Sequence, residues 1–445
     1  MMKISEMPKY DDYVDSGVEW LGRVPSHWQI IRLKNTINGC VNGLWGADPN
    51  GKDELVVVRV SDFDEQKLNV SDEKLTYRSI PENERKSRLL KFGDLLIEKS
   101  GGGDKTLVGR VVLFDKSYTA VTSNFVAKMT PKNWVNHSFL KYVFFSLYSR
   151  GVNYVSIKQT TGIQNLDANS YLNEVFCFPD EFVQAEVANF LDKKTALIDE
   201  AISIKEQQIS LLKERKQIII QQAVTQGLDP NVPMKDSGMD WIGKIPQHWK
   251  LKPNKCLFKL KKSLVGKRSG DYELLSLTLK GIIKRDMDNP EGKFPAEFNT
   301  YQEVSVGDFV FCLFDVEETP RTVGLSKFNG MITGAYTVFE LDESVSKEFL
   351  YYFYLNLDSR KMMRPLYKGL RNTISKETFL SFKSFIPPLK EQEEIVDFIE
   401  YEVNKIDLTI DGISEQIDKI KEYKSCLING SVTGKIKVTS EMAER

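Results

Sequence analysis

A chain of 445 residues is too long for one ordinary domain and predicts roughly two to four. Lys and Arg number 61 and Asp and Glu 62, so the formal net charge of -1 excludes binding of nucleic acid through total charge alone. Five scattered Cys residues without a C-x-x-C pair exclude a disulfide scaffold and a Cys-based zinc finger. The sequence contains no signal-peptide or membrane-spanning pattern, so we expect a cytoplasmic protein.

The sequence is internally duplicated. Residues 15–28 (DSGVEWLGRVPSHW) and 236–249 (DSGMDWIGKIPQHW) share the pattern D-S-G-x-x-W-x-G-x-x-P-x-H-W. Residues 184–228 also align without a gap to residues 392–436. Between these matched segments the two halves differ in length and sequence. We therefore expect a duplicated two-part protein in which similar ends surround divergent middles.

The divergent middles, roughly 29–180 and 250–386, are typical of mixed α/β domains. Short apolar runs bounded by Gly, Asp and Ser predict strands, for example LVVVRV at 55–60. The aromatic-rich stretches HSFLKYVFFSLYS (137–149) and KEFLYYFYLNLDS (347–359) predict buried amphipathic helices at equivalent places. The sequence thus predicts one fold used twice with different surfaces.

The matched segments after each middle predict long helices. Apolar residues recur in both at alternating steps of four and three, the heptad spacing of a coiled-coil seam, although Lys424 interrupts the second. Positions 191 to 223 would span roughly 48 Å at about 1.5 Å per residue. Each helix could pack on its own domain, but the shared register favours antiparallel pairing of the two. The predicted seam consists of Leu191, Ile198, Ile202, Ile209, Leu212, Ile219, Ile399, Val403, Ile406, Ile410, Ile413, Ile417, Ile420 and Leu427.

Motifs for catalysis are incomplete. The segment GGGDKT (101–106) resembles a phosphate-binding loop, but Asp104 and Lys99 stand where a P-loop needs Gly, which favours a loop tip near a partner. Asp94 with Glu98 and Lys99 resembles the carboxylate set of a nuclease, but its spacing is wrong. We expect no catalytic residue and no metal ligand in this chain, and therefore a binding protein.

Basic residues are clustered although the total charge is close to zero. Residues 241–270 and 359–376 contain Lys and Arg but no acidic residue, as do 20–47 and 141–166 in the first copy. Such runs are often only solvated faces, but their recurrence favours a phosphate-facing surface. Amide and hydroxyl side chains among them can read base edges, whereas Lys alone fixes position. The predicted DNA-contacting residues are Lys99, Lys105, Lys158, Gln159, Thr160, Gln164, Asn165, Lys261, Lys262, Lys267, Arg268, Lys368, Arg371 and Asn372.

Taken in this order, the sequence resembles the specificity subunit of a bacterial type I restriction–modification system over nearly its whole length. The resemblance includes the duplicated D-S-G entry and the pattern P-x-x-x-x-Q-x-x-[IV]-x-x-[FL], which begins at Pro179 and Pro387. Further shared segments within the helices lie at 198–199, 212–216 and 224–225 and at 406–407, 420–424 and 432–433.

The resemblance implies two similar α/β target-recognition domains that each read one half of a split DNA site. They would be joined by two long helices that pair as an antiparallel coiled coil, duplicated about a pseudo-two-fold axis. The expected division is a first target-recognition domain at 1–183, a first spacer helix at 184–228, a second target-recognition domain at 229–388, a second spacer helix at 389–433 and a tail at 434–445.

The resemblance also implies partners. The helices would set the spacer between the half-sites and dock two modification subunits, which bind S-adenosylmethionine and methylate adenine at N6. A restriction subunit, an ATP- and Mg-dependent motor and nuclease, would join for cleavage. This chain would be non-catalytic and would hold no cofactor. A coiled-coil adaptor without DNA specificity and an autonomous nuclease or methyltransferase remain the alternatives.

Overall fold

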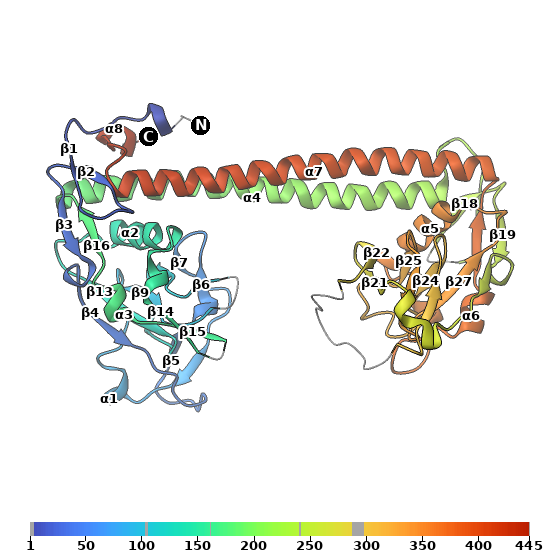
Figure 1. Cartoon of the computed structure of the whole chain (residues 1–445), viewed down its shortest axis with the longest axis horizontal. Coiled ribbons are helices and arrows are strands. Elements are labelled where there is room, and N and C mark those ends of the chain that lie inside the picture. Colours follow the sequence, from blue (N-terminus) through green and yellow to red (C-terminus); the bar gives the residue numbers. More distant parts are fainter. Residues whose placement is uncertain (1–3, 103–105, 161, 240–241, 287–297, 445) are drawn as a thin grey trace. The chain divides into compact units, whose positions relative to one another are not determined.

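The computed structural model describes residues 4–102, 106–160, 162–239, 242–286 and 298–444. The chain divides into two compact units, the first formed by Met1–Gln207 with Ile413–Arg445 and the second by Gln208–Gly412. Each unit contains one β-rich globular domain together with parts of two long helices, α4 (Glu181–Gln226) and α7 (Leu389–Val432) (Figure 1).

The first unit is built mainly of short strands. These are β1 (Tyr13–Asp15), β2 (Arg23–Pro25), β3 (Gln29–Arg32), β4 (Ile37–Asn42), β5 (Glu54–Val58), β6 (Phe63–Asp64), β7 (Asn69–Val70), β8 (Tyr77–Ser79), β9 (Leu95–Glu98), β10 (Ser100–Gly101), β11 (Val111–Leu113), β12 (Ala120–Thr122), β13 (Val126–Pro131), β14 (Ile157–Thr160), β15 (Ile163–Leu166) and β16 (Val175–Phe178). The short helices are α1 (Glu82–Arg85), α2 (His137–Ser149), α3 (Ala168–Tyr171) and α8 (Ser440–Glu444). The sheet orders are β4-β13-β9-β11-β7-β6, β12-β5-β8, β10-β15-β14, β1-β2 and β16-β3.

The second unit repeats this architecture with smaller sheets. Its strands are β17 (Met234–Asp236), β18 (Lys244–Pro246), β19 (Lys250–Pro253), β20 (Phe258–Leu260), β21 (Leu275–Thr278), β22 (Gly281–Lys284), β23 (Gln302–Val304), β24 (Phe309–Phe311), β25 (Val323–Leu325), β26 (Gly330–Ile332), β27 (Thr337–Leu341) and β28 (Lys383–Ile386). Its shorter helices are α5 (Lys347–Ser359) and α6 (Lys376–Ser381). The strands pair in the orders β20-β27-β24-β25, β19-β28, β17-β18, β21-β22 and β23-β26.

The aromatic helices α2 and α5 begin in the same way. The side chains of Asn136 and Ser346 accept hydrogen bonds from the backbone N–H groups of Phe139 and Phe349, which satisfies one otherwise unpaired donor at each helix start. Both helices place most of their Phe and Leu side chains in the core. The sequence predicted these two helices, and their bounds agree with the predicted stretches 137–149 and 347–359.

An aromatic cluster forms the core of the second unit. Phe258 is buried and lies 5.3 Å from Phe309 and 5.7 Å from Tyr354 between ring centroids, in edge-to-face arrangements. Truncating one such ring to Ala costs about 3–5 kcal/mol because the cavity left behind does not collapse. Ends of both long helices join this cluster through Ile220, Ala223, Val224, Ile395, Val396 and Ile399. The domain therefore packs directly on α4 and α7.

The two long helices run antiparallel. In the first unit Asp199 of α4 accepts a hydrogen bond from Lys424 of α7 at 2.7 Å, and Lys205 bonds Gln416 at 2.7 Å. Rising residue numbers in α4 thus meet falling numbers in α7. The mixed α/β class and the helix pairing predicted from the heptad pattern are confirmed. The alternative prediction, that each long helix packs only on its own domain and not on the other helix, is wrong.

Candidate nucleic-acid interface

In the first unit, the predicted polar residues converge on the small sheet β10-β15-β14. Lys158 lies opposite Asn165 and Gln159 opposite Gln164 in the β14–β15 hairpin, while Ser100 of β10 lies opposite Asn165 on the other side. Residues that are up to 65 positions apart in the sequence are thereby brought to one sheet. This sheet is the first candidate surface for reading DNA.

These side chains differ in how free they are. Lys158, Gln159 and Asn165 are exposed. Lys158 donates to Asp167 at 3.0 Å, and this hydrogen bond lowers the pKa of the Asp167 carboxyl. Gln164, in contrast, is buried, and its amide oxygen accepts the backbone N–H of Val108 at 3.1 Å. Gln164 therefore supports the hairpin from inside, and the exposed residues are placed to meet a ligand.

The remaining predicted residues of the first copy surround this sheet. Lys99 immediately precedes β10, is half-buried, and donates to the side chain of Asn42 at 2.7 Å. Thr160 ends β14. Lys105 lies outside the described residues. The structure thus brings Lys99, Lys158, Gln159 and Asn165 to one small sheet, with the two lysines at its opposite edges.

A cavity of about 470 Å³ lies beside β10 and the start of β15. Three exposed apolar side chains line it, Trp45, Phe125 and Ile163, and the guanidinium of Arg78 lies 4.4 Å from the centre of the Trp45 ring. Aromatic rings that remain partly exposed are common at surfaces that bind a partner. No local sequence pattern indicated this group, because its members come from separate segments of the chain.

The carboxylates that resembled a nuclease set have structural partners. Glu98 is fully buried and accepts two hydrogen bonds from Arg110, at 2.8 and 3.0 Å. Burial raises the pKa of Glu98 to about 7, although backbone N–H groups oppose the shift. Asp94 accepts a hydrogen bond from Thr130 at 2.6 Å and seals a turn before β9. Within the described ranges, no group of three or more His, Cys, Asp or Glu side chains is placed to hold a metal ion.

In the second unit, the equivalent hairpin is shorter. Lys368 and Thr373 exchange two backbone hydrogen bonds, at 2.9 and 3.0 Å. Between them Arg371 is exposed, and Asn372 is half-buried with a positive φ of 43°, a conformation that Asn adopts more readily than most residues. The backbone oxygen of Arg371 accepts the N–H of Asp315 at 2.9 Å. This bond anchors the hairpin next to β24 and leaves the Arg371 side chain at the surface.

The predicted basic residues before β21 differ in exposure. Lys261 is half-buried and donates to Asp308 at 2.7 Å and to Ser305 at 2.8 Å, so it holds a turn. Lys262, Lys267 and Arg268 are exposed. The exposed three therefore remain the candidates for phosphate contact in this segment.

Every residue of the predicted helix-pairing seam is buried or half-buried. A salt bridge at each end keeps the helices in register. Lys424 bonds Asp199 in the first unit, and Lys216 bonds Asp407 at 2.7 Å in the second. The two pairs are related by the 208-residue offset of the duplication, since 216 corresponds to 424 and 199 to 407. Lys424, which interrupts the apolar seam in the sequence, is thus one half of an ion pair.

The repeated Gln of the P-x-x-x-x-Q pattern links each domain to its helix. Gln184 is buried, accepts the backbone N–H of Asn136 at 2.9 Å and donates to the carbonyl of Pro179 at 3.0 Å. Gln392 makes the same contacts in the second unit, accepting from Ser346 at 2.9 Å and donating to Pro387 at 2.8 Å. The same joint is therefore built twice.

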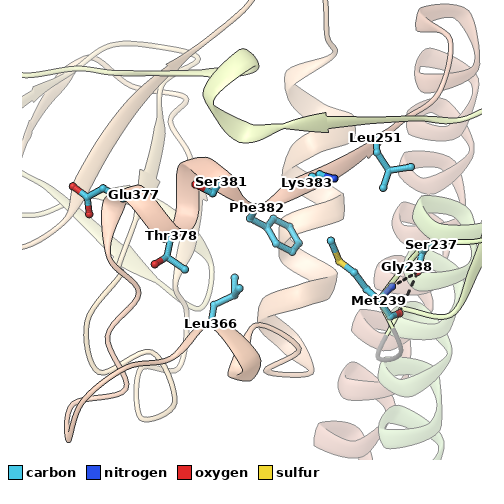
Figure 2. A pocket seen from close by; sticks show the side chains of 10 residues that line it. All are labelled: Ser237, Gly238, Met239, Leu251, Leu366, Glu377, Thr378, Ser381, Phe382 and Lys383. Atoms are coloured by element: carbon cyan, nitrogen blue, oxygen red, sulfur yellow. Dashed lines mark hydrogen bonds between the residues drawn. The ribbon is translucent and has the colours of Figure 1, made fainter.

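The repeated D-S-G segment forms the same turn in both copies. Asp15 and Asp236 accept the backbone N–H groups of the Gly two residues later, at 2.9 and 2.8 Å. In the second unit, this segment lines an open hollow of about 600 Å³. Figure 2 shows Met239 pointing toward Phe382 across this hollow, with the Ser237 hydroxyl bonded to the backbone of Met239. The turn therefore acts in local structure and packing.

Comparisons with known proteins agree with this arrangement. A family model of the type I restriction modification DNA specificity domain matches residues 323–419. The chain is 21% identical over 434 residues to the type I restriction enzyme MjaX specificity subunit of Methanocaldococcus jannaschii, which covers 94% of this chain and 96% of that protein.

A solved structure shows the same fold. A chain from a study of complex assembly and conformational transition in a type I restriction–modification system superposes with a TM-score of 0.63 at 13% identity, covering 92% of this chain and 98% of that chain. The HsdS subunit of Thermoanaerobacter tengcongensis gives a TM-score of 0.48 at 13% identity, covering 93% of this chain and 98% of that one.

The family-model match and the near-full-length relative both fall in one class of protein, the DNA-specificity components of restriction–modification systems. The chain is similar along nearly its whole length to the specificity subunits of type I systems, and it shares their fold. Proteins of this family are non-catalytic, and the family implies recognition of a DNA target. In the part of the chain that the structure describes, no helix combines the length and the apolar composition that crossing a membrane requires.

Proposed function

We propose that this specificity subunit reads a split DNA site, with one half-site bound by each target-recognition domain, 1–183 and 229–388. The observation that carries the proposal is the joint at Gln184 and Gln392, which is the same in both units. The surfaces beyond the joint differ, since Lys158, Gln159 and Asn165 stand on one and Arg371 on the other. Two domains with different surfaces, attached to the helices by equivalent contacts, suit an asymmetric DNA target with two separate parts.

The long helices would fix the spacer between the half-sites. α4 has 46 residues and α7 has 44, and neither is interrupted. A paired helix resists bending better than a single one, and it rises about 1.5 Å per residue, so its length sets a distance. The salt bridges Lys424–Asp199 and Lys216–Asp407 support one register of the pair.

The outer face of α4 is suited to dock a helical partner. Leu197, Ile204, Leu211 and Ile218 lie seven residues apart, and their exposed fractions are 55%, 49%, 65% and 44%. Residues at this spacing form a stripe along one face of a helix. Exposed apolar stripes mark interaction sites, and a helix from a modification subunit would bury this one.

The rest of the complex follows from the family. Two modification subunits would bind S-adenosylmethionine and methylate adenine at N6, and restriction subunits would use ATP and Mg²⁺ for cleavage. This chain would hold none of these cofactors, and the complex would act in the cytoplasm on double-stranded DNA. The predicted site residues of both domains would supply its DNA contacts.

Single-molecule methylation mapping tests this function directly. The chain and its modification subunit are expressed together in a host without other adenine methylation, and the methylated positions are read across the genome. We expect one motif with two short specified halves around an unspecified spacer of constant length. A continuous motif would contradict the split-site proposal, and no motif at all would favour an adaptor without DNA specificity.

Exchange of one domain provides the matched control. Replacing residues 250–386 with the corresponding region of another specificity subunit should change one half-site and leave the other half-site and the spacer unchanged. A change in both half-sites would show that the domains do not read independently.

A further inference from the structure

A second polar cavity lies in the second unit, and the predicted DNA-contacting residues are not among the described residues that line it. It measures about 340 Å³ and lies where α4, α5 and α7 meet the residues before β25. Lys213, Lys216 and Arg321 contribute three positive charges to its lining, and Asp407 contributes one negative charge. Lys216 is paired with Asp407, and Arg321 lies 4.0 Å from the buried carboxylate of Asp358, so among the described residues Lys213 supplies the positive charge that no ion pair offsets. Gln217, Asn356 and Ser359 add polar groups. The lining therefore favours an anionic ligand.

Two donors at this cavity have no acceptor among the described residues. The side-chain amide nitrogen of Asn356 and the Nε of Arg321 are both buried and unpaired, and Asn356 is only 3% exposed. A buried donor without an acceptor costs about 1–3 kcal/mol, so most such groups in folded proteins have a partner. Two such donors beside one cavity favour an acceptor that a ligand supplies.

The first unit shows what occupies the equivalent place there. Lys424, which corresponds to Lys216, donates to Asp199 and also to the backbone oxygen of Gln66 at 2.6 Å. The turn between β6 and β7 thus supplies an oxygen acceptor, and Lys424 is only 8% exposed. In the second unit, Lys216 donates to both oxygens of Asp407, and its side chain remains 30% exposed. The lysine of this repeated Lys–Asp pair thus has a further carbonyl acceptor in the first unit, whereas in the second unit it lies beside the cavity.

We propose that this cavity binds a phosphate group, supplied either by the backbone of bound DNA or by free phosphate. The inference deepens the proposed function, on which its DNA source rests. Donors approach from α4, α5 and the residues before β25, which suits the tetrahedral oxygens of phosphate. A carboxylate has two oxygens in one plane, and it matches donors that approach from three elements less well. A phosphate held here would fix the second domain on the DNA without reading sequence.

Two single substitutions test the DNA source. Lys213 is exposed on α4. Lys421 is exposed at the corresponding position of α7, 208 residues later, and it serves as the control because Lys424 beside it already donates to the carbonyl of Gln66. Lys213→Ala should weaken DNA binding about 5-fold at about 0.15 M salt and reduce the slope of log Kd against log salt by about 0.9, the value for one lost phosphate contact. Lys421→Ala should change neither quantity. The measurement uses the full chain assembled with its modification subunit.

Thermal unfolding of the full chain without DNA tests the second source. Inorganic phosphate should raise Tm relative to chloride at equal ionic strength in the wild type and in Lys421→Ala, and it should not do so in Lys213→Ala. Asn356→Ser gives an independent variant, because Ser146 occupies the equivalent position of α2. It should lose the phosphate effect while the fold is kept.

The outcomes separate the possibilities. A change of salt slope supports DNA phosphate, and a phosphate-specific rise in Tm alone supports the free anion. Equal behaviour of Lys213→Ala and Lys421→Ala in both measurements would overturn the proposal, as would a rise in Tm with acetate and none with phosphate. If the wild-type complex showed no selective DNA binding, the proposed function would fail, and the thermal measurement would still decide the cavity.

Discussion

Gln164 and Asn165 are neighbours in β15, but they have opposite environments. Successive side chains of a strand point to opposite faces, so one amide is buried and the other is exposed. The sequence grouped both as readers of base edges because it shows the residue type and not the face. The bond from Val108 to Gln164 shows that one of the two amides is used inside the protein.

Alanine substitutions should separate these two roles. Gln164→Ala leaves the buried Val108 N–H without an acceptor and should lower the free energy of unfolding by about 1–3 kcal/mol. Asn165→Ala should change stability by less than about 0.5 kcal/mol, as expected for an exposed site, and should weaken selective DNA binding. Denaturant unfolding and titration with target DNA check both. Loss of DNA binding without loss of stability in Gln164→Ala would reverse the assignment.

At the scale of elements, the two salt bridges between α4 and α7 are equivalent in sequence but not in environment. The side chains of Lys424 and Asp199 are 10% and 13% exposed, whereas those of Lys216 and Asp407 are 30% and 49% exposed. Removing one partner of a buried pair strands the other charge, and an exposed partner is rehydrated by water. The register of the helices should therefore depend mainly on the pair in the first unit.

Truncation of each lysine measures this difference. Lys424→Ala should cost about 3 kcal/mol, because it strands Asp199 and also leaves the Gln66 carbonyl without its donor. Lys216→Ala should cost at most about 1 kcal/mol. Calorimetric unfolding of the full-length variants gives both values. Equal losses would mean that burial does not decide the strength of these pairs.

The elements themselves were predictable to different degrees. The heptad spacing predicted both long helices and their pairing, because a repeated apolar period over many turns survives local exceptions. The buried pair Lys424–Asp199 was not predicted, since its partners lie 225 positions apart and a lysine in a seam reads as an interruption. The cavity around Asn356 was also missed, because its lining comes from four separate segments. Contacts of that kind have no signal in local sequence.

At the scale of the whole molecule, duplication explains why identity and difference occur where they do. The contacts that attach each domain to its long helix recur, as at Gln184 and Gln392, because both copies connect domain and helix in the same way. The contacts at the candidate DNA surfaces diverge, as the proposed reading of two different half-sites requires. Under that proposal the helices set the spacing and the domains set the sequence, so the two properties should change independently.

Shortening both helices by one heptad tests this independence. Deleting residues 204–210 and 413–419 removes segments that lie opposite each other in the antiparallel register, since Lys205 bonds Gln416, and it keeps both Lys–Asp pairs. Seven residues correspond to about 10.5 Å of helix, or about three base pairs at roughly 3.4 Å each. We therefore expect methylation mapping to find both half-sites unchanged and the spacer shorter by about three base pairs.

Deleting 204–210 alone should abolish methylation, because the seam of α4 then no longer matches that of α7. An unchanged spacer in the double deletion would mean that the helices do not set the distance, and an altered half-site would mean that they do more than that.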